Sequence, residues 1–481
     1  GGVIKFKNIE NLTVGNYAYT RYQDRDDDYG DAYWNATEAI LYLWDGNGSG
    51  SISSVLNPED DEALPGLTKT MDVTVYGSDG NDYFNLNVNR TDDYTGNWTL
   101  VMGAGNDSLG AAALINGDSV DMGAGDDEVA LMINSHTPTV ANLNLVKLDG
   151  GAGTDTLSFQ NFTNTAELTL STGGATNFEN IIGSGGSETI KGDANNNILA
   201  GGDGGDTIYG YGGHDILIAN ATQVTSILET WDNPDKALFG DGTQRLSWVD
   251  SDYAISRGEN TYRTGDNTLY GGAGNDALFG GYGDDTLDGG TGGDILYGGS
   301  GSDIFIIRTG DGSTNAEDTD IVIDFTNGTD VIGLDGVAYD DLTIAQGTGT
   351  DTTNKNNEQN VLISVTATGE ILLIIRDTDA SDITAADFSS TSTESQTFTG
   401  TSGNDTFIGG AGNDTFNGGA GSDVLYGHGG NDTFNITDKS GAFTDIVDGG
   451  SGTDTLVIDY TGVDSLSDFT ITYDSTNGYI V

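Results

Sequence analysis

Apolar and polar residues alternate with a nine-residue period over residues 271–305. Each repeat has a glycine two positions before an aspartate and an apolar residue two positions after it. The aspartates are Asp276, Asp285, Asp294 and Asp303, and the apolar residues are Leu278, Leu287, Leu296 and Phe305. Glycine pairs in every repeat exclude a helix, since each glycine there costs about 1 kcal/mol. The pattern predicts a solenoid of very short strands and tight glycine turns, each unit stacked on the next.

The same turn recurs along most of the chain. A nine-residue spacing joins Glu188, Asn197, Asp206 and Asp215, and a second regular block holds Asp405, Asp414, Asp423 and Asp432, with Asp454 after it. Spacers of 25, 20 and 28 residues separate Asp82, Asp107, Asp127 and Asp155, which predicts wider coils with turns on one edge. In all eighteen turns, Asn267 included, an apolar residue follows the polar one by two positions. We expect these apolar residues to form an inward ladder.

These patterns predict an all-β protein, with parallel β-roll or β-solenoid blocks and an interposed β-sandwich-like cap. The cap is expected where alternating strands such as TDIVIDF and EILLIIRD replace the turns, because an open roll leaves a sheet edge to be covered. The predicted regions are an irregular N-terminal β region at 1–76, a wide-coil solenoid passing into a roll at 77–218, an insertion at 219–266, a regular roll at 267–308, the cap at 309–398, a second roll at 399–458 and the start of an incomplete second cap at 459–481.

The residue types in the turns indicate a metal. Glycine permits positive φ and lets the backbone come close to a ligand, so that its carbonyl oxygens become donors. The aspartate adds a charged oxygen. A site built from oxygens alone, without cysteine or a nearby histidine, suits calcium best.

The pattern GGxGxD followed by an apolar residue at the second position resembles the calcium-binding nonapeptide of the repeats-in-toxin (RTX) proteins, over roughly residues 77–458. The resemblance implies a right-handed parallel β-roll, with two repeats per coil and several calcium ions held between turns two repeats apart. Asp276 would then share an ion with Asp294, and Asp285 with Asp303. The implied metal ligands are Asp82, Asp107, Asp127, Asp155, Asp206, Asp215, Gly271, Gly272, Ala273, Gly274, Asp276, Gly280, Gly281, Tyr282, Gly283, Asp285, Gly289, Gly290, Thr291, Gly292, Asp294, Gly298, Gly299, Ser300, Gly301, Asp303, Asp405, Gly409, Gly410, Ala411, Gly412, Asp414, Gly418, Gly419, Ala420, Gly421, Asp423, Asp432 and Asp454.

The net charge of the chain limits the classes of partner that it can bind. With 75 acidic and 16 basic residues the formal net charge is −59, which excludes nucleic acid and anionic membranes. A chain this acidic repels itself, so compaction should need cations. Disorder is the alternative explanation of such charge, but 35% of the residues are apolar and the acids fall at fixed repeat positions.

The chain has no cysteine and no apolar run long enough for a membrane span. A secreted protein without disulfides needs another stabiliser, and bound calcium is sufficient. No secretory signal is visible in a sequence that begins at Gly1. The resemblance implies type I secretion, which uses an uncleaved C-terminal signal, so we expect an extracellular, cell-surface location.

Three segments stand apart from the repeat. Residues 22–34 are acidic and aromatic, and we interpret them as a solvated loop. Residues 45–56 match part of an EF-hand, but Leu56 replaces the bidentate glutamate, which favours a polar turn over a metal site. The insertion 219–266 either covers an apolar flank or docks a neighbouring copy through Trp231, Trp248, Lys236, Arg245, Arg257 and Arg263.

No catalytic residue is predicted, and we expect no enzyme activity. The histidines are His136, His214 and His428, and the latter two lie in turns where we expect them to face solvent. The sequence has no HExxH, no GxSxG and no Gly-Lys-Ser/Thr phosphate loop. Paired carboxylates could serve a glycosidase, but each acid here has a prior role as metal ligand or solvated charge.

Two functions remain. The first is a calcium-dependent structural protein (an S-layer, sheath or filament subunit) that folds and assembles on calcium after export, with other copies of itself and cell-surface polysaccharide as partners. The second is the non-catalytic, calcium-binding portion of a larger secreted adhesin, toxin or hydrolase.

Overall fold

The computed structural model describes 72–77, 79–85, 96–112, 114–131, 145–160, 167–219, 265–349, 359–437 and 443–459, together with short strand segments at 3–5, 11–13, 38–42, 49–51, 472–474 and 478–480. The chain divides into two units, residues 1–234 with 251–264 and residues 235–250 with 265–481. In the described residues the secondary structure is strand apart from four 3-10 turns, η2 (Thr172–Gly174), η3 (Ala316–Asp318), η4 (Tyr339–Asp341) and η5 (Ala385–Asp387). The predicted all-β class is confirmed.

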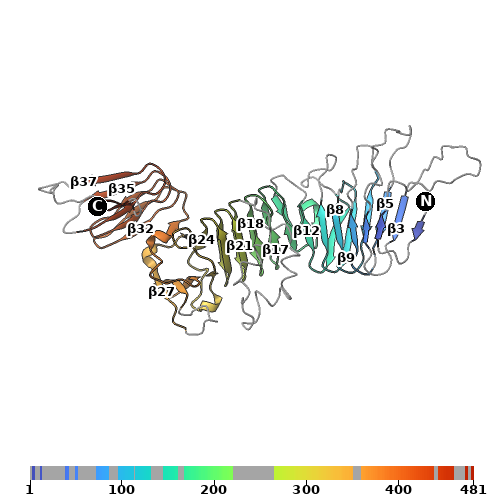
Figure 1. The fold of residues 1–481 in the computed structure, drawn as a ribbon, viewed down its shortest axis with the longest axis horizontal. Coiled ribbons are helices and arrows are strands. Elements are labelled where there is room, and N and C mark those ends of the chain that lie inside the picture. The colour runs from blue at the N-terminus through green and yellow to red at the C-terminus, as the bar shows by residue number, and fades with distance from the viewer. Residues whose placement is uncertain are drawn as a thin grey trace, which may run out of the picture. The chain divides into compact units, whose positions relative to one another are not determined.

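In the first unit, successive strands alternate between sheets and pair in parallel one coil apart (Figure 1). One sheet has the order β1 (Val3–Lys5), β3 (Glu38–Tyr42), β5 (Asp72–Tyr76), β7 (Trp98–Val101), β9 (Ser119–Ala124), β11 (Lys147–Ala152) and β14 (Ala175–Thr176). A second has β2 (Asn11–Thr13), β4 (Ser49–Ser51), β6 (Tyr83–Asn85), β8 (Ser108–Ala112), β10 (Glu128–Leu131), β12 (Thr156–Ser158), β15 (Asn180–Ile182), β17 (Ile198–Ala200) and β19 (Ile216–Ile218). A third has β13 (Glu167–Thr169), β16 (Thr189–Lys191) and β18 (Thr207–Gly212).

The regular roll of the second unit repeats every two nonapeptides. Thr268 pairs with Thr286 in one sheet and Ala277 with Ile295 in the other, an 18-residue register in both. The first sheet contains β20 (Thr268–Ala273), β22 (Thr286–Thr291) and β24 (Ile304–Ile307), and the second β21 (Ala277–Tyr282) and β23 (Ile295–Ser300). Two repeats therefore make one coil, as the resemblance implied.

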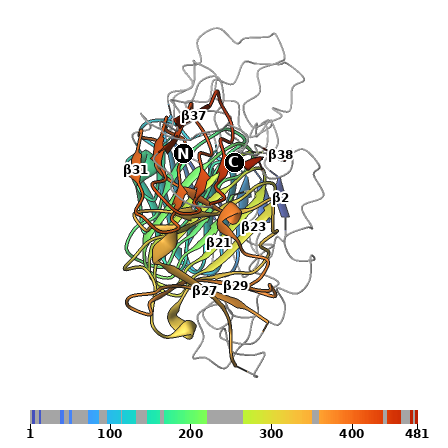
Figure 2. The same ribbon diagram turned by 90° about the vertical axis from the view of Figure 1, so that its left-hand side faces the viewer.

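Residues 309–398 add parallel strands to both sheets of this roll and also form an antiparallel meander. Strands β26 (Val331–Leu334) and β30 (Phe388–Ser390) continue the first sheet in parallel, and β25 (Ile321–Val322) and β29 (Ile371–Ile375) continue the second. An antiparallel meander of β27 (Leu342–Gln346), β28 (Val361–Val365) and β29 then closes the second sheet, with β28 between the other two strands (β27 and β29 are labelled in Figure 2).

The second roll has the same two-sheet plan with shorter strands. One sheet holds β31 (Thr397–Thr399), β33 (Thr415–Asn417), β35 (Thr433–Thr437) and β37 (Thr455–Asp459). The other holds β32 (Thr406–Ile408), β34 (Val424–Tyr426), β36 (Ile446–Asp448), β39 (Gly478–Ile480) and β38 (Thr472–Asp474), of which the last two pair antiparallel. Phe398, Phe416 and Phe434 stack with ring centroids 4.8 and 4.7 Å apart along its core.

The inward apolar ladder is confirmed. All eighteen apolar residues that follow the polar turn residue are buried, except Phe407 and Leu456, which pack partly buried against the same core. Because a strand alternates its faces, placing this position inward also puts the turn residue two places earlier on the inner side. The apolar period therefore determines where the turn acids point.

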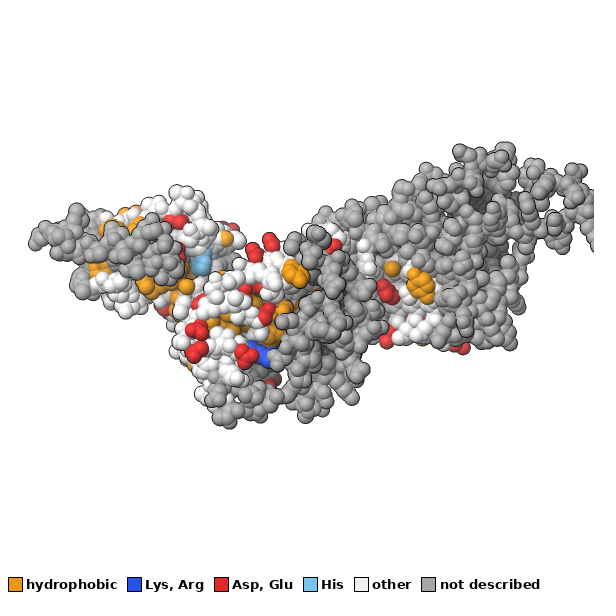
Figure 3. Space-filling model, in the orientation of Figure 1, with side chains coloured by type: hydrophobic (Ala, Val, Ile, Leu, Met, Phe, Trp, Pro, Cys, Tyr) orange, Lys and Arg blue, Asp and Glu red, His pale blue; other side chains and the backbone are white. Residues whose placement is uncertain are grey.

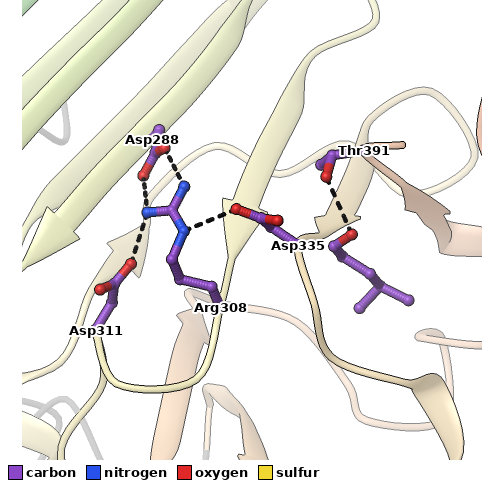
Figure 4. A network of polar contacts seen from close by, with 6 residues as sticks. Asp288, Arg308, Asp311, Asp335 and Thr391 are labelled. Carbon is purple, nitrogen blue, oxygen red and sulfur yellow. Dashed lines mark hydrogen bonds and ion pairs between the residues drawn. The ribbon is translucent and has the colours of Figure 1, made fainter. Parts of the chain in front are cut away.

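Arg308, directly after β24, links this strand to β22 and β26 of the first sheet. Its guanidinium makes a bidentate pair with Asp288 of β22 and contacts Asp311 (2.7 Å) and Asp335 (2.9 Å), which follows β26 (Figure 4). Figure 4 also shows Thr391, whose hydroxyl donates to the carbonyl of Leu334. These charge-assisted bonds raise the Arg308 pKa.

We expect Arg308→Gln to lower the stability of the fold by about 2 kcal/mol, because it leaves the nearly buried Asp288 carboxylate without its partner. The effect should appear in thermal unfolding with and without calcium, since the cation removed is part of the chain. Lys191→Gln is the control, because Lys191 forms an ion pair with the exposed Glu167 on a solvated face, and it should leave the melting temperature nearly unchanged. Equal losses for the two variants would contradict a special role for Arg308.

The close stacking of coils gives a second expectation. A Cβ on Gly292 would coincide with the carbonyl oxygen of Gly274 one coil away, whereas a Cβ on Gly328 would meet nothing within 4 Å. Both residues have positive φ, 142° and 76°. Gly328→Ala should therefore cost about 1 kcal/mol of backbone strain, and Gly292→Ala more than about 3 kcal/mol, measured by chemical denaturation. Similar costs would show that the coils can move apart.

Candidate metal centre

Hydrogen bonds join turn acids that lie one coil apart. The N–H of Asp276 donates to Oδ1 of Asp294 (2.8 Å), and the N–H of Asp285 donates to Oδ1 of Asp303 (2.9 Å). The structure thus brings together the two pairs that the resemblance assigned to shared ions. The same bond joins Asp405 to Asp423 (3.1 Å) and Asp414 to Asp432 (2.7 Å) in the second roll.

The second carboxylate oxygen, Oδ2, lacks a hydrogen-bond partner in several turns. In six of the predicted ligands Oδ2 is buried and has no hydrogen-bond partner among the described residues, and no Lys or Arg forms an ion pair with them: Asp107, Asp127, Asp155, Asp285, Asp303 and Asp432. We call their turns open. A buried carboxylate oxygen without a donor or a cation is strongly destabilising, so an open turn is an incomplete site.

A main-chain carbonyl oxygen converges on the same place. A Cβ built on Gly271 would lie 2.6 Å from Oδ2 of Asp276 and 2.5 Å from the carbonyl oxygen of Gly289. At Gly409 the corresponding atoms are Oδ2 of Asp414 (2.5 Å) and the oxygen of Gly427 (2.7 Å). The first glycine of the turn is therefore required, because any side chain would fill the space that these two oxygens face.

Some predicted backbone donors are already engaged. The carbonyls of Tyr282, Thr291 and Ser300 accept the N–H groups of Gly265 (3.3 Å), Gly274 (2.9 Å) and Gly283 (3.0 Å), one coil earlier. A carbonyl oxygen has two lone pairs, so these three could each offer one to an ion. The other backbone ligands predicted from the sequence remain predictions.

Burial raises the pKa of the open-turn acids. The pKa rises to about 8 for Asp107, to about 7 for Asp155 and Asp303, and to about 6 for Asp127, Asp285 and Asp432, with desolvation the largest cause. Bonds from backbone N–H groups oppose this rise but do not cancel it. The carboxylates are therefore in an environment that disfavours their charge unless a cation is near.

The donor set fits a hard divalent cation. Within the described ranges no three His, Cys, Asp or Glu side chains gather as a metal cluster. An ion at an open turn would be held by carboxylates from adjacent coils, completed by main-chain carbonyls such as that of Gly298 beside Asp285. Calcium accepts six to eight such oxygens in variable geometry, whereas zinc prefers nitrogen and sulfur ligands.

A family model of the RTX calcium-binding nonapeptide repeat matches residues 72–88, 182–217, 263–287, 270–305, 279–312, 399–434 and 440–457. The chain carries RTX repeats. The RTX repeat binds calcium and is typical of secreted proteins, so this is a calcium-binding protein. A comparison with curated proteins found no match to the chain. In the part of the chain that the structure describes, no helix has the length and apolarity of a membrane span.

Four RTX turns satisfy their own polar residue, and we call them closed. The second residue of the turn donates its N–H to the side chain four positions on: Ser184 to Glu188, Asp193 to Asn197, Thr401 to Asp405 and Gly410 to Asp414. Asn197 also donates to the carbonyl of Glu179 (2.8 Å). At these turns an ion would have to displace a hydrogen bond.

Sequence reasoning missed four acids that complete the RTX rows. Asp294, Asp303, Asp423 and Asp155 donate their N–H groups to Asp320 (3.0 Å), Asp330 (3.1 Å), Asp445 (2.9 Å) and Glu179 (2.8 Å). All four missed acids stand two positions before a buried apolar residue, namely Ile181, Val322, Ile332 and Val447. That spacing, with Gly328 two positions before Asp330, was the available signal.

The histidine prediction was half correct. His214 is exposed, as expected. The expectation that His428 faces solvent is wrong: it is mostly buried beside Phe388, its Nε2 has no hydrogen-bond partner, and burial lowers its pKa. The reason is its turn position, where φ is 65° and the side chain is directed against β30.

Three other sequence predictions are not tested. Residues 22–34, His136 and the Trp and basic residues of the insertion at 219–266 lie outside the described residues. Of 45–56 only the backbone of 49–51 is described, as β4.

The raised pKa values predict opposite pH dependences with and without metal. A carboxyl whose pKa is higher in the fold than its ordinary value of about 4 takes up a proton on folding, so the metal-free fold should gain stability as pH falls from about 8 to about 5. Protons compete with calcium for the same oxygens, so the rise in melting temperature on adding calcium should shrink over that range. Melting curves in calcium and in chelator at pH 8, 7, 6 and 5 test this. A calcium effect independent of pH would contradict it.

Proposed function

We propose that this chain is a calcium-dependent extracellular structural protein, a subunit of an S-layer, sheath or filament that folds and assembles when it meets calcium after export. The observation that supports it is the row of buried turn carboxylates, in register from coil to coil, whose free oxygens need a cation. Without that cation the stacked coils would hold adjacent negative charges in a low-dielectric interior.

The difference in calcium concentration between the cytosol and the cell exterior would control when the chain folds. Extracellular calcium modules bind with dissociation constants of about 10⁻⁴ to 10⁻³ M, far above cytosolic calcium. The chain would stay expanded inside the cell, and millimolar calcium outside would favour the folded state by mass action. Each site contributes little alone, but many sites acting on one stack add their free energies.

Surface charge supports a role for calcium in assembly as well. Acidic side chains are spread over the described surface in Figure 3, and basic ones show at one place on that face. Copies of such a chain repel one another at low salt. Divalent cations reduce that repulsion, so the ions that fold the coils would also permit contact between folded copies.

Electron microscopy of the purified chain tests the structural role. With millimolar calcium we expect sheets or filaments, and with chelator dispersed and expanded particles. Folded but dispersed particles in calcium would contradict the structural role and leave the second candidate, the calcium-binding portion of a larger exported protein.

A paired variant tests the turn chemistry itself. Asp285→Asn with Asp303→Asn keeps the Oδ1 acceptors but removes two charges from open turns, so the calcium concentration at half-folding should rise about 3- to 10-fold. Asp266→Asn with Asp284→Asn is the matched control, with the same change in net charge at exposed neighbours. Circular dichroism during calcium titration measures both. Equal midpoints for the two variants would show that open turns hold no ion.

A further inference from the structure

We propose that the free edge of β37 pairs with the same strand of a second copy of this chain, so that two second rolls join edge to edge in antiparallel register. β37 is the last strand of its sheet, and no described strand lies on its other side. An unpaired sheet edge presents main-chain N–H and C=O groups that can bind another strand. The inference rests on the proposed assembly role, but it concerns a contact between copies rather than a metal site.

β37 has a counterpart in the first roll. In both rolls the segment Thr-Asp-Ile-Val, at 319–322 and at 444–447, is followed by a strand that a second Thr-Asp pair precedes, β26 in the first roll and β37 in the second. The acids of these pairs, Asp330 and Asp454, accept the N–H of the turn acid one coil earlier through Oδ1 (3.1 and 2.9 Å). β37 is therefore the equivalent of β26.

The two strands differ in what covers their outer edge. β30 pairs with β26, and just beyond it the carbonyl of Leu334 accepts both the N–H (3.1 Å) and the hydroxyl (3.3 Å) of Thr391 (Figure 4). The residue of β37 that corresponds to Leu334 is Ile458. Among the described strands only β35 pairs with β37, so the edge that β30 covers in the first roll is open in the second.

The open edge presents the main chain of Leu456 and Ile458. The N–H of Thr455 points back toward β35, because it donates to the carbonyl of Asp432 (2.8 Å). Successive residues of a strand direct their N–H and C=O groups to opposite sides. The main-chain groups of Leu456 and Ile458 therefore point away from β35, which places two donors and two acceptors on one short edge.

The side chains at this edge are apolar and exposed. Val457 is 38% exposed and Ile458 is 37% exposed, and Leu456 packs only partly buried against the core of the roll. In the first roll the equivalents of Leu456 and Ile458 are Ile332 and Leu334, and both are buried. A strand on the edge of β37 would bury apolar surface that the first roll already buries.

The sequence of β37 matches itself in antiparallel register. With Val457 opposite Val457 of the second copy, Leu456 lies opposite Ile458, and Thr455 lies opposite Asp459. Leu456 and Ile458 then form hydrogen-bonded pairs through the main-chain groups that point outward, and no acidic residue lies opposite another. Because residue i contacts residue j and j contacts i, the contact has two-fold symmetry.

Charge and size favour a second copy held by a weak contact. The net charge of −59 makes copies of the chain repel one another over most of their surface, whereas residues 455–458 are uncharged. A stable dimer covers about 800 Å² on each partner, which is more than a single short strand can supply. We therefore expect a dimer that forms only as the protein concentration rises, and that gains strength where further contacts act with it in an assembly.

A cysteine at Val457 tests the register, since the chain has no cysteine of its own. Opposite residues at a non-hydrogen-bonded position have Cα atoms about 4.5 Å apart, within reach of a disulfide. Diamide, which takes up the two thiol hydrogens, should convert the full-length Val457→Cys chain in millimolar calcium to a covalent dimer on a non-reducing gel. Val146→Cys, at another exposed valine, is the matched control and should stay mostly monomeric. Equal dimer yields for the two variants would overturn the inference.

A lysine at Val457 tests the contact in solution. Val457→Lys would place two like charges face to face across the two-fold axis. By sedimentation velocity in calcium, the wild type and the control Val146→Lys should show a dimer fraction that rises with concentration, and Val457→Lys should stay monomeric over the same range. Circular dichroism should give Val457→Lys the same calcium midpoint of folding as the wild type, because the side chain that it replaces is exposed.

The outcomes separate this inference from the proposed function. If the wild type and Val457→Lys form the same sheets or filaments and neither shows a dimer through β37, the edge contact is absent and the structural role stands. If the wild type dimerises and cross-links through Val457→Cys but forms no sheet or filament, the inference stands and the structural role fails. A wild type that stays monomeric at every concentration in calcium, with no cross-link at Val457→Cys, overturns the inference.

Discussion

The interaction on which this structure depends is the repulsion among buried turn carboxylates and its compensation by cations. Every turn residue of the RTX type except Asp405 and Asp454 is at most 3% exposed. Strands one coil apart lie about 4.8 Å from each other, so two such charges repel by about 3 to 4 kcal/mol at an effective dielectric constant of 20. Such a stack is therefore disfavoured as a polyanion, and bound cations would relieve the repulsion.

The structure compensates for the repulsion among buried carboxylates in three ways. Open turns leave an oxygen for an ion. Closed turns, such as that of Asp405, use an N–H from the same turn. At the end of the regular roll a guanidinium, that of Arg308, faces three carboxylates. The three solutions differ in what they require from the surroundings, because only the first depends on the calcium concentration.

Much of this could be read from the sequence. The nine-residue period predicted the inward ladder at Leu278 and its equivalents, and the RTX resemblance implied the two-repeat coil and the pairing of Asp276 with Asp294. The turn of Asp320 has no glycine two positions before the acid, and that of Asp330 keeps Gly328 but lacks the glycine pair, so neither was recognised as a continuation of the rows. The sequence also could not show that the turn of Asp414 is closed and that of Asp432 is open. The difference depends on whether the N–H of the second turn residue points to the carboxylate. His428 was misjudged for a related reason, since a turn position does not reveal what packs against it.

The number of turns per coil changes along the chain. In the wide coils only one edge passes through a glycine–aspartate turn, whereas the coils from Glu188 to Asp215 and from Asn267 to Asp303 have one at both edges. The number of turns per coil that could take an ion is thus twofold higher in the coils from Asn267 to Asp303, and the closed turns of Glu188 and Asn197 reduce it in the coils before them. The steepness of a binding curve increases with the number of linked sites, so the two-edged coils should respond to calcium over a narrower concentration range than the one-edged coils. A single chain would then contain both a graded and a switch-like segment.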